Sequence, residues 1–341
     1  MPVARTLPRL LLALLLMAVS PAWARSGEHP ACKGQQGEQT LPYDSVPPPG
    51  YDHDRFGTGP QGLMFRFGAF TSSFTAPDDG GAPPVYRALP RWVAYEMHAL
   101  MDSDGQPLHP LGARRPSKWY ELGETSFLWD DAPGIRHHGL DASYRGFAQM
   151  WNRGHMAARG HANRLSWQEG CNTHVFVNAL PQFAGMNQGD WEALENYAAA
   201  LANRYGRVWT MAGPIFEANR TVEFIGRPGT VPVPVPHALY KILAIEDGGR
   251  VEARAFIFPQ ADADQREQYR RCAGTPQAKF DLGRYAVRIS TIEAATGLRF
   301  FQRLDKARRQ ALDTASDGGP WPVAPRYYDE SCGGRADSDD S

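Results

Sequence analysis

The sequence has no apolar stretch long enough to cross a membrane. Its longest uncharged apolar run covers residues 10–19, whereas a membrane-spanning helix needs roughly 20 residues. A polytopic membrane protein is therefore excluded, and we expect no membrane partner. Strong charge of either sign is also lacking, because 36 basic and 37 acidic residues leave a net charge of −1. The chain therefore has no overall positive field of the kind that would indicate a polyanionic partner. The 341 residues, 42% of them apolar, suffice for one large domain or two small ones with a buried core.

Lysine is scarce as well. Only Lys33, Lys118, Lys241, Lys279 and Lys306 occur, so 31 of the 36 basic residues are arginine. The planar guanidinium matches phosphate oxygens in a bidentate way. For the bias as a whole, however, genomic base composition is the explanation that we prefer.

The short apolar run predicts an export signal. It follows Arg5 and Arg9 and precedes Ala22-Trp23-Ala24, which gives the charged, apolar and small-residue regions of a secretory signal peptide. We therefore expect residues 1–24 to be a signal peptide and the mature protein to be secreted or periplasmic. Without the two arginines, 34 basic residues remain against 37 acidic ones, a net charge of about −3.

All four cysteines lie in the part that would be exported. An even number of cysteines in an oxidising compartment predicts two disulfides rather than a metal cluster, and the sequence has no CxxC pair. Three pairings of Cys32, Cys171, Cys272 and Cys332 are possible. We favour Cys171 with Cys272 in the middle of the domain and Cys32 with Cys332 between its tails.

Two common hydrolase signatures are missing. GxSxG is absent, which argues against a serine hydrolase, and HExxH is absent, which argues against a zinc hydrolase. His155 and His161 have no third zinc ligand at a useful spacing. We interpret His161, His174 and the pair His137-His138 as ordinary polar residues.

The local patterns predict one mixed α+β domain preceded by an arm and followed by a tail. Residues 25–60 are rich in Gly, Pro and polar residues and indicate an irregular arm, and the polar sequence predicts a tail over 306–341. Apolar residues recur at helical spacing after Asp190, a candidate N-cap, and stop before Gly206. Strands are expected at 91–97, 173–179, 207–212 and 298–301, a hairpin at 235–246 and 251–258, and a second helix near 290–295.

One constellation of residues suggests chemistry. Arg153 and His155 are two positions apart, so an extended segment presents both on one face. Asn187 follows 32 residues after His155, just before the predicted helix, and Glu195 lies eight positions further inside it. Residues seven or eight apart share a helix face. Asn187 and Glu195 can therefore point into one cleft, where an amide oxygen and a carboxylate are hard ligands suited to Mg²⁺ or Mn²⁺.

These residues belong to motifs that resemble those of the DNA/RNA non-specific endonucleases of the ββα-metal class, the endonuclease G-like family. The segment 90–95, Pro-Arg-Trp-Val-Ala-Tyr, looks like the first core strand of the family, and 152–155 looks like its DRGH signature. Residues 178–182 are similar to its N-x-x-P-Q segment and 187–195 to its N-x-x-x-W-x-x-L-E pattern. Residues 213–216 and 292–298 look like further counterparts, so the resemblance covers about residues 61–305.

The resemblance implies an α+β, mixed ββα-metal nuclease fold with a central antiparallel sheet flanked by helices, in a domain over residues 61–305. It implies an exported endonuclease that hydrolyses DNA and RNA with little sequence specificity. His155 would be the general base, and Asn187 the direct protein ligand of Mg²⁺, with Mn²⁺ as an alternative ion. Glu195 would hold water molecules of the ion, and Asn178 would orient the histidine. Arg153 would contact the phosphate, and Arg115, followed by Trp119, is preferred over Arg114 as the second phosphate ligand.

Asn152 departs from the signature, which has aspartate at this position. The asparagine keeps a carbonyl acceptor but removes a negative charge beside the expected metal. This departure motivates a second hypothesis, in which the chain is a catalytically weakened nucleic-acid-binding or partner-binding protein on the same scaffold. No feature of the sequence indicates an inhibitor protein or an oligomeric state.

Overall fold

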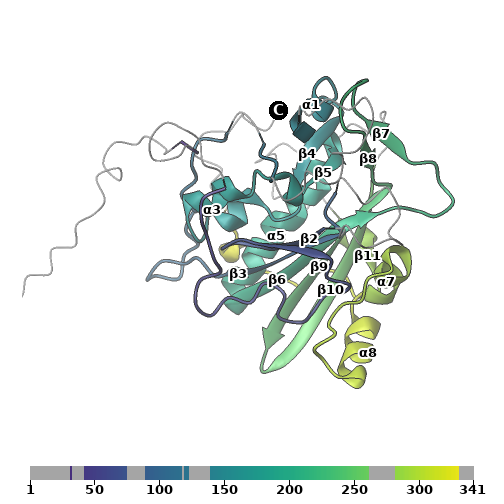
Figure 1. The fold of residues 1–341 in the computed structure, drawn as a ribbon. Helices are drawn as coiled ribbons and strands as arrows, with labels where there is room; N and C mark the ends of the chain where they lie inside the picture. The colour runs from purple at the N-terminus through teal and green to yellow at the C-terminus, as the bar shows by residue number, and fades with distance from the viewer. Residues whose placement is uncertain are drawn as a thin grey trace, which may run out of the picture.

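Seven antiparallel strands form the main sheet in the computed structural model, which describes residues 31–32, 42–74, 89–116, 119–122, 139–260 and 281–329. The strand order is β1-β2-β3-β6-β9-β10-β11 (Figure 1). The strands span β1 Leu63–Arg66, β2 Thr71–Phe74, β3 Trp92–His98, β6 Arg207–Ile215, β9 Ala238–Asp247, β10 Arg250–Pro259 and β11 Ala286–Val287. The predicted strands at 91–97 and 207–212 correspond to β3 and β6.

The predicted hairpin is the β9–β10 pair. Its turn consists of Gly248 and Gly249, both with positive φ, 57° and 78°, as a tight two-residue turn between twisted strands requires. Val235 lies outside the hairpin, in the separate pair formed by β7 Glu223–Ile225 and β8 Val233–Val235. The strand expected at 298–301 is reduced to a single bridge between Arg299 and Gly59.

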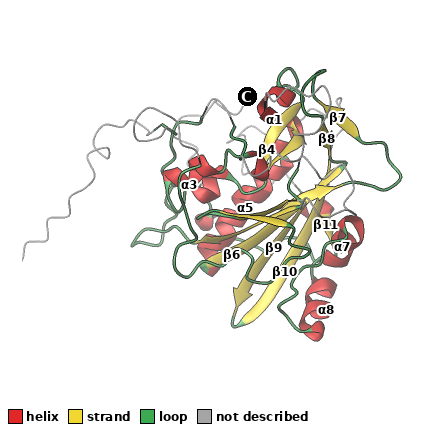
Figure 2. Cartoon of the chain, viewed as in Figure 1, coloured by secondary structure: helices red, strands yellow, loops and turns green. Residues whose placement is uncertain are grey.

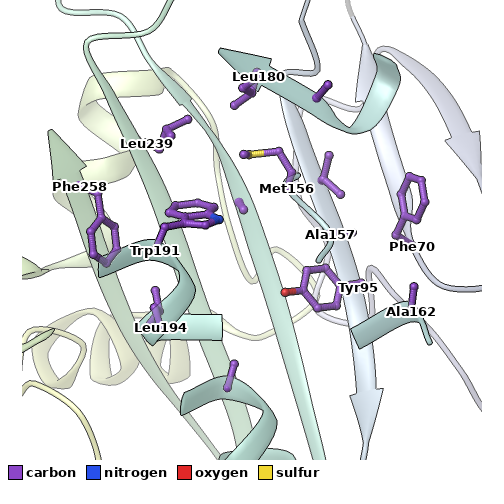
Figure 3. Packing of buried hydrophobic residues seen from close by; sticks show 14 of the residues in the cluster. Phe70, Tyr95, Met156, Ala157, Ala162, Leu180, Trp191, Leu194, Leu239 and Phe258 are labelled. Atoms are coloured by element: carbon purple, nitrogen blue, oxygen red, sulfur yellow. The ribbon is translucent and has the colours of Figure 1, made fainter. Parts of the chain in front are cut away.

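The sheet is buried on both faces. In β3, Val93, Tyr95 and Met97 belong to one apolar cluster, whereas Trp92 and Ala94 belong to the other. The first cluster lies under the long helix α5, Asp190–Tyr205, whose Trp191 and Leu194 pack towards the sheet (Figure 3). The second lies under α7, Ile289–Thr296, and α8, Lys306–Ala315 (Figure 2). The central antiparallel sheet flanked by helices that the sequence predicted is confirmed.

The long helix begins and ends close to the predicted residues. Gly206 terminates α5 in the left-handed conformation, with φ 83°. The N-cap, however, is Gly189 rather than Asp190. The Asp190 carboxylate instead accepts a hydrogen bond of 2.7 Å from the Tyr285 hydroxyl, in the short η5 helix, Leu282–Tyr285.

The segment after residue 305, expected to be a polar tail, contains part of the fold. Helix α8 begins where Asp305 accepts a hydrogen bond from the Arg308 backbone N–H, at 2.9 Å, and its Leu312 is buried against the sheet. Further on, the Trp321 carbonyl accepts a hydrogen bond from the Tyr197 hydroxyl of α5, and η6 spans Pro325–Tyr327. The sequence is polar here because only one face of α8 is covered.

A second, smaller layer lies on the α5 side of the sheet (Figure 1). It contains α1 Gly139–Tyr144 and the antiparallel pair β4 Trp151–His155 and β5 Ala179–Phe183. Between these strands run α2 Arg159–Ala162, α3 Trp167–Asn172 and η4 Phe176–Asn178, and α4 Ala184–Asn187 follows β5. The strand predicted at 173–179 is wrong: its alternating pattern forms η4, and only Ala179 enters β5.

The disulfide differs from the favoured pairing. Cys32 is bonded to Cys171, with Cα atoms 5.6 Å apart, so neither Cys171–Cys272 nor Cys32–Cys332 forms. The disulfide ties the arm to α3, and residue 31 of the arm bridges to Arg114. The partners could not be deduced because cysteine spacing does not encode which loops meet. Cys272, Cys332 and the signal peptide 1–24 lie outside the described residues. Within the described ranges, no helix has the length and apolarity to span a membrane.

Candidate active site

A cleft of about 610 Å³ opens between α1, β4, α2 and α5. Five of the six predicted site residues line it: Arg115, Arg153, His155, Asn187 and Glu195. Arg114 is not among the lining residues, so the structure places the preferred arginine on the cleft wall. Trp119, Asp141, His161, His174 and Asn152 line the same cleft.

Strand β4 presents Arg153 and His155 on one face, as their spacing predicted. Gly154, between them, faces Gln182 of β5, and a Cβ atom at this position would lie 1.6 Å from the Gln182 side-chain oxygen. Gln182 is fully buried. The close approach of the two strands, and with it the position of His155, therefore requires glycine at position 154.

Replacing Gly154 by alanine is expected to lower the free energy of unfolding by about 1–3 kcal/mol, because overpacking a buried contact forces side chains or backbone to shift. Activity is expected to fall together with stability, since β4 carries Arg153 and His155. Urea titration measures the loss of unfolding free energy. Gly160→Ala is the matched control, because a Cβ atom added at Gly160 would meet no atom within 4 Å; equal stability of the two variants would contradict the packing argument.

His155 lies among aromatic rings and positive charges. The Trp119 ring centroid is 4.5 Å from that of His155, and His174 approaches edge-on at 4.8 Å. Burial, followed by the charges of His174, Arg115, Arg159 and Arg153, holds the pKa of His155 well below its usual value. Its Nε2 is buried and has no hydrogen-bond partner among the described residues. The imidazole is therefore neutral at physiological pH and able to accept a proton.

Asn178 is fully buried and does not line the cleft. Its side-chain oxygen accepts a hydrogen bond from the Ala157 N–H at 2.8 Å, and its amide nitrogen donates to the carbonyls of Ala157 and Thr173, both at 3.0 Å. Asn178 thus holds the backbone two residues after His155, and any effect on the imidazole is transmitted through that backbone.

Arg153 is paired with an acidic residue that sequence reasoning did not identify. Its guanidinium donates to the Asp141 carboxylate of α1, and both side chains remain about a quarter exposed. A guanidinium has five N–H donors, so Arg153 can keep this pair and still contact a phosphate. Asp141 belongs to no motif near β4 in the sequence, so no local signal identified it.

Asn187 and Asn152 are hydrogen-bonded to each other. The Asn187 amide nitrogen donates to the Asn152 side-chain oxygen at 3.1 Å, and the Asn152 nitrogen donates to the Ala148 carbonyl at 3.1 Å. With its nitrogen engaged, Asn187 has its side-chain oxygen left for another ligand. Asn152 therefore orients the predicted metal ligand.

Glu195 contacts a buried lysine and a half-buried histidine. The Lys241 ammonium of β9 donates to its carboxylate at 3.1 Å. The Glu195 backbone carbonyl accepts from His161 Nε2 at 3.0 Å, and His161 Nδ1 accepts from the Tyr95 hydroxyl at 3.0 Å. Burial, with the charges of Lys241 and Arg164, lowers the pKa of His161 to about 3. The sequence did not identify His161, His174 or Lys241 because their partners come from distant elements.

The oxygen donors of the cleft fit a hydrated divalent cation. The described residues contain no group of three or more His, Cys, Asp or Glu side chains that could hold a metal. Mg²⁺, however, keeps several of its waters and takes only one or two protein oxygens. The Asn187 amide oxygen can supply one such protein oxygen, and the Glu195 carboxylate, which lines the same cleft, can accept hydrogen bonds from the waters of the ion. Both oxygen donors differ from the sulfur and nitrogen ligands typical of zinc.

Comparison with known proteins agrees with this geometry. The sequence profile of the DNA/RNA non-specific endonuclease family matches residues 85–307. The chain belongs to this family. The match contains every predicted site residue and also the residues found only in the structure, Asp141, His161, His174 and Lys241.

The relatives of this chain include two mitochondrial endonucleases G. The chain is 31% identical to the human protein over 204 residues, 57% of this chain and 62% of the relative. It is 30% identical to the bovine protein over 222 residues, 62% of this chain and 67% of the relative. The match thus leaves about a third of each relative uncovered.

A solved structure shares the fold. It is the crystal structure of the EndoG/EndoGI complex, described as showing the mechanism of EndoG inhibition. The TM-score is 0.52 at 22% identity, and the match covers 75% of this chain and 92% of the other. This likeness shows that both chains have the same α+β, ββα-metal nuclease fold.

Proposed function

We propose that this protein is an exported, metal-dependent endonuclease that hydrolyses DNA and RNA with little sequence preference and leaves 5′-phosphate ends. The observation that carries the proposal is the convergence of His155, Asn187, Glu195, Arg153 and Arg115 on one cleft. Family membership and the nuclease names of the relatives support it. Arginines that contact phosphates bind the nucleic-acid backbone, which carries no sequence information directly. Such a cleft is therefore expected to show little sequence preference.

Each residue contributes one part of phosphodiester hydrolysis. His155, neutral for the reasons given above, takes the proton of the attacking water. Because its Nε2 is turned into the protein, Nδ1 is the nitrogen that performs this step. Arg153 and Arg115 hold the phosphate oxygens and stabilise the charge that develops on them. Asp141, which lines the same cleft, pairs with the Arg153 guanidinium and limits its movement.

Asn187, oriented by Asn152, would hold Mg²⁺, with Mn²⁺ as an alternative ion, and Glu195 would hold the water shell of the ion. When bound, the ion supplies charge stabilisation for the phosphate and for the leaving oxygen. The remaining positions of such an ion would be taken by water and by phosphate oxygens.

Plasmid DNA and RNA digestion tests the proposal directly. With Mg²⁺ we expect both substrates to be degraded, and with EDTA neither. The second hypothesis, a weakened nucleic-acid-binding protein, gives a different result: retarded migration on a native gel without cleavage in either buffer. Binding in both cases weakens with salt, because phosphate contacts release counterions.

The low pKa of His155 predicts the acidic limb of the pH profile. A general base must be unprotonated, so lowering its pKa extends activity to lower pH. We expect kcat/KM at saturating Mg²⁺ to stay level from pH 8 to about 6.5, the usual pKa of histidine, and to fall only below it. A half-maximal point at or above 6.5 would show that burial and the neighbouring charges do not govern this group.

Restoring the acidic residue of the family signature should strengthen metal binding. Asn152→Asp keeps the acceptor for Asn187 and adds a negative charge beside the proposed ion. Such a charge is worth about 1 kcal/mol in a solvated cleft, so the Mg²⁺ concentration for half-maximal activity should fall roughly fivefold. A metal titration of both proteins measures it, and superimposable curves would contradict the expectation.

We also propose that the protein acts outside the cytoplasm, in the periplasm or the medium. The export signal predicted at residues 1–24 and the Cys32–Cys171 disulfide support this location. Cell fractionation with N-terminal sequencing of the mature protein tests it. Recovery of an uncleaved chain in the cytoplasm would reject the proposal.

A further inference from the structure

Lys241 is a fully buried cation at a position where the strand pattern calls for an apolar residue. It lies in β9 between Leu239 and Leu243, which share its face of the sheet and belong to the apolar cluster beneath α5. Its exposure is 0%. Removing a charge from water costs several kcal/mol unless a partner compensates. A buried lysine at the centre of the sheet therefore requires an explanation.

The compensation comes from one turn of α5. The ammonium donates to Glu195 at 3.1 Å and lies 3.9 Å from the ring centroid of Trp191. Trp191 and Glu195 are four residues apart, so they stand on the same side of the helix and hold Lys241 between them. The Glu195 side chain is 19% exposed and lines the cleft, so it extends from the buried ammonium to the substrate side.

Stability alone does not account for this arrangement. Replacing a buried ion pair by apolar residues of similar volume is often neutral or stabilising, and the neighbours of Lys241 along its face are leucines. The pair does, however, restrain one oxygen of the Glu195 carboxylate against rotation about the side-chain bonds. Such a restraint on the Glu195 carboxylate is useful only where its orientation affects what binds in the cleft.

We propose that Lys241 is a positioning residue, which holds the Glu195 carboxylate at the cleft in the orientation that the divalent cation requires. The proposal rests on the metal-dependent function proposed above. Lys241 does not line the cleft, so its effect on the bound cation is transmitted through the Glu195 carboxylate to which its ammonium is bonded. It is not a catalytic residue.

Metal binding without substrate tests the proposal. Mn²⁺ is titrated into the full disulfide-bonded protein, and free ion is followed by electron paramagnetic resonance. We compare wild type, Lys241→Met, Glu195→Gln and the double variant. Outer-shell residues of a metal site typically contribute 10–100-fold to affinity. Lys241 acts through one such residue, Glu195, so Lys241→Met is expected to weaken Mn²⁺ binding about tenfold, at the lower end of that range. The double variant is expected to bind no more weakly than Glu195→Gln alone, because Lys241 has nothing left to orient.

Two results would overturn it: a folded Lys241→Met protein with wild-type Mn²⁺ affinity, or a double variant whose affinity is reduced by the product of the two single effects. Thermal unfolding of each variant separates a structural role from positioning. If Lys241→Met fails to fold, Lys241→Gln, which can still donate a hydrogen bond but carries no charge, takes its place in the same titration. If the wild type itself neither binds Mn²⁺ nor cleaves nucleic acid, it is the proposed function that fails.

Discussion

Replacing Asn187 by alanine is expected to reduce DNA and RNA hydrolysis about 10³-fold or more while leaving the chain folded. A metal ion that stabilises charge in the transition state supplies several kcal/mol, and each 1.36 kcal/mol is a factor of ten in rate. Asn187 lies at the end of the short helix α4 and is half-buried. Its only side-chain hydrogen bond to a described residue is the one to Asn152, so its loss should cost little stability.

The measurement is the initial rate on plasmid DNA over a range of Mg²⁺ concentrations, together with Mn²⁺ binding. Asn187→Asp retains an oxygen ligand and is expected to keep part of the activity. Asn219→Ala removes the same group from an exposed position in the loop before β7 and serves as the control. A substantially active Asn187→Ala protein with normal Mn²⁺ affinity would remove the metal from the proposed mechanism.

The parts of the fold that the sequence predicted are those governed by local rules. Apolar residues at helical spacing and a glycine at the end define α5, and two consecutive glycines define the β9–β10 turn. In both cases the residues that determine the structure are neighbours in the chain. The same holds for Arg153 and His155, whose spacing on one strand places both in the cleft.

Predictions failed where distant parts of the chain decide the structure. Residues 173–179 alternate like a strand, but the Asn178 side chain bonds to backbone groups at Ala157 and Thr173, and the segment turns into η4. Leu312 falls in the predicted polar tail, but β10 and α7 provide a surface on which α8 packs. The partner of Cys171 is 139 residues away, a separation that no local pattern reports.

The candidate site shows the same division. The residues that would touch substrate or metal lie in recognisable motifs, because their chemistry restricts residue type and spacing. The residues that contact them, such as Asp141, His174 and Lys241, carry no such signal. Each is placed by tertiary contacts, and each alters the charge or position of a motif residue. From the sequence alone, the reaction that the cleft supports can therefore be predicted better than the contacts that hold its residues in place.

Replacing His155 by alanine should lower the rate by about 10²–10⁴, the contribution typical of a positioned general base. The arginines and the metal site remain in this variant, so binding of nucleic acid and of Mn²⁺ is expected to be nearly unchanged, in contrast to Asn187→Ala. Rates at saturating substrate, Mn²⁺ titration and a gel-shift assay measure the three properties, and His109→Ala, an exposed loop histidine, is the control.

External imidazole distinguishes a missing base from a disturbed fold. The deleted ring leaves a space beside Trp119 and His174 at the cleft, and a small base that enters it can accept the proton in place of His155. Rescue should therefore rise with the concentration of the unprotonated form of imidazole. His155→Ala protein that cleaves DNA at the wild-type rate would show that another group activates the water. Failure of rescue together with lost Mn²⁺ binding would show instead that His155 supports the structure of the site.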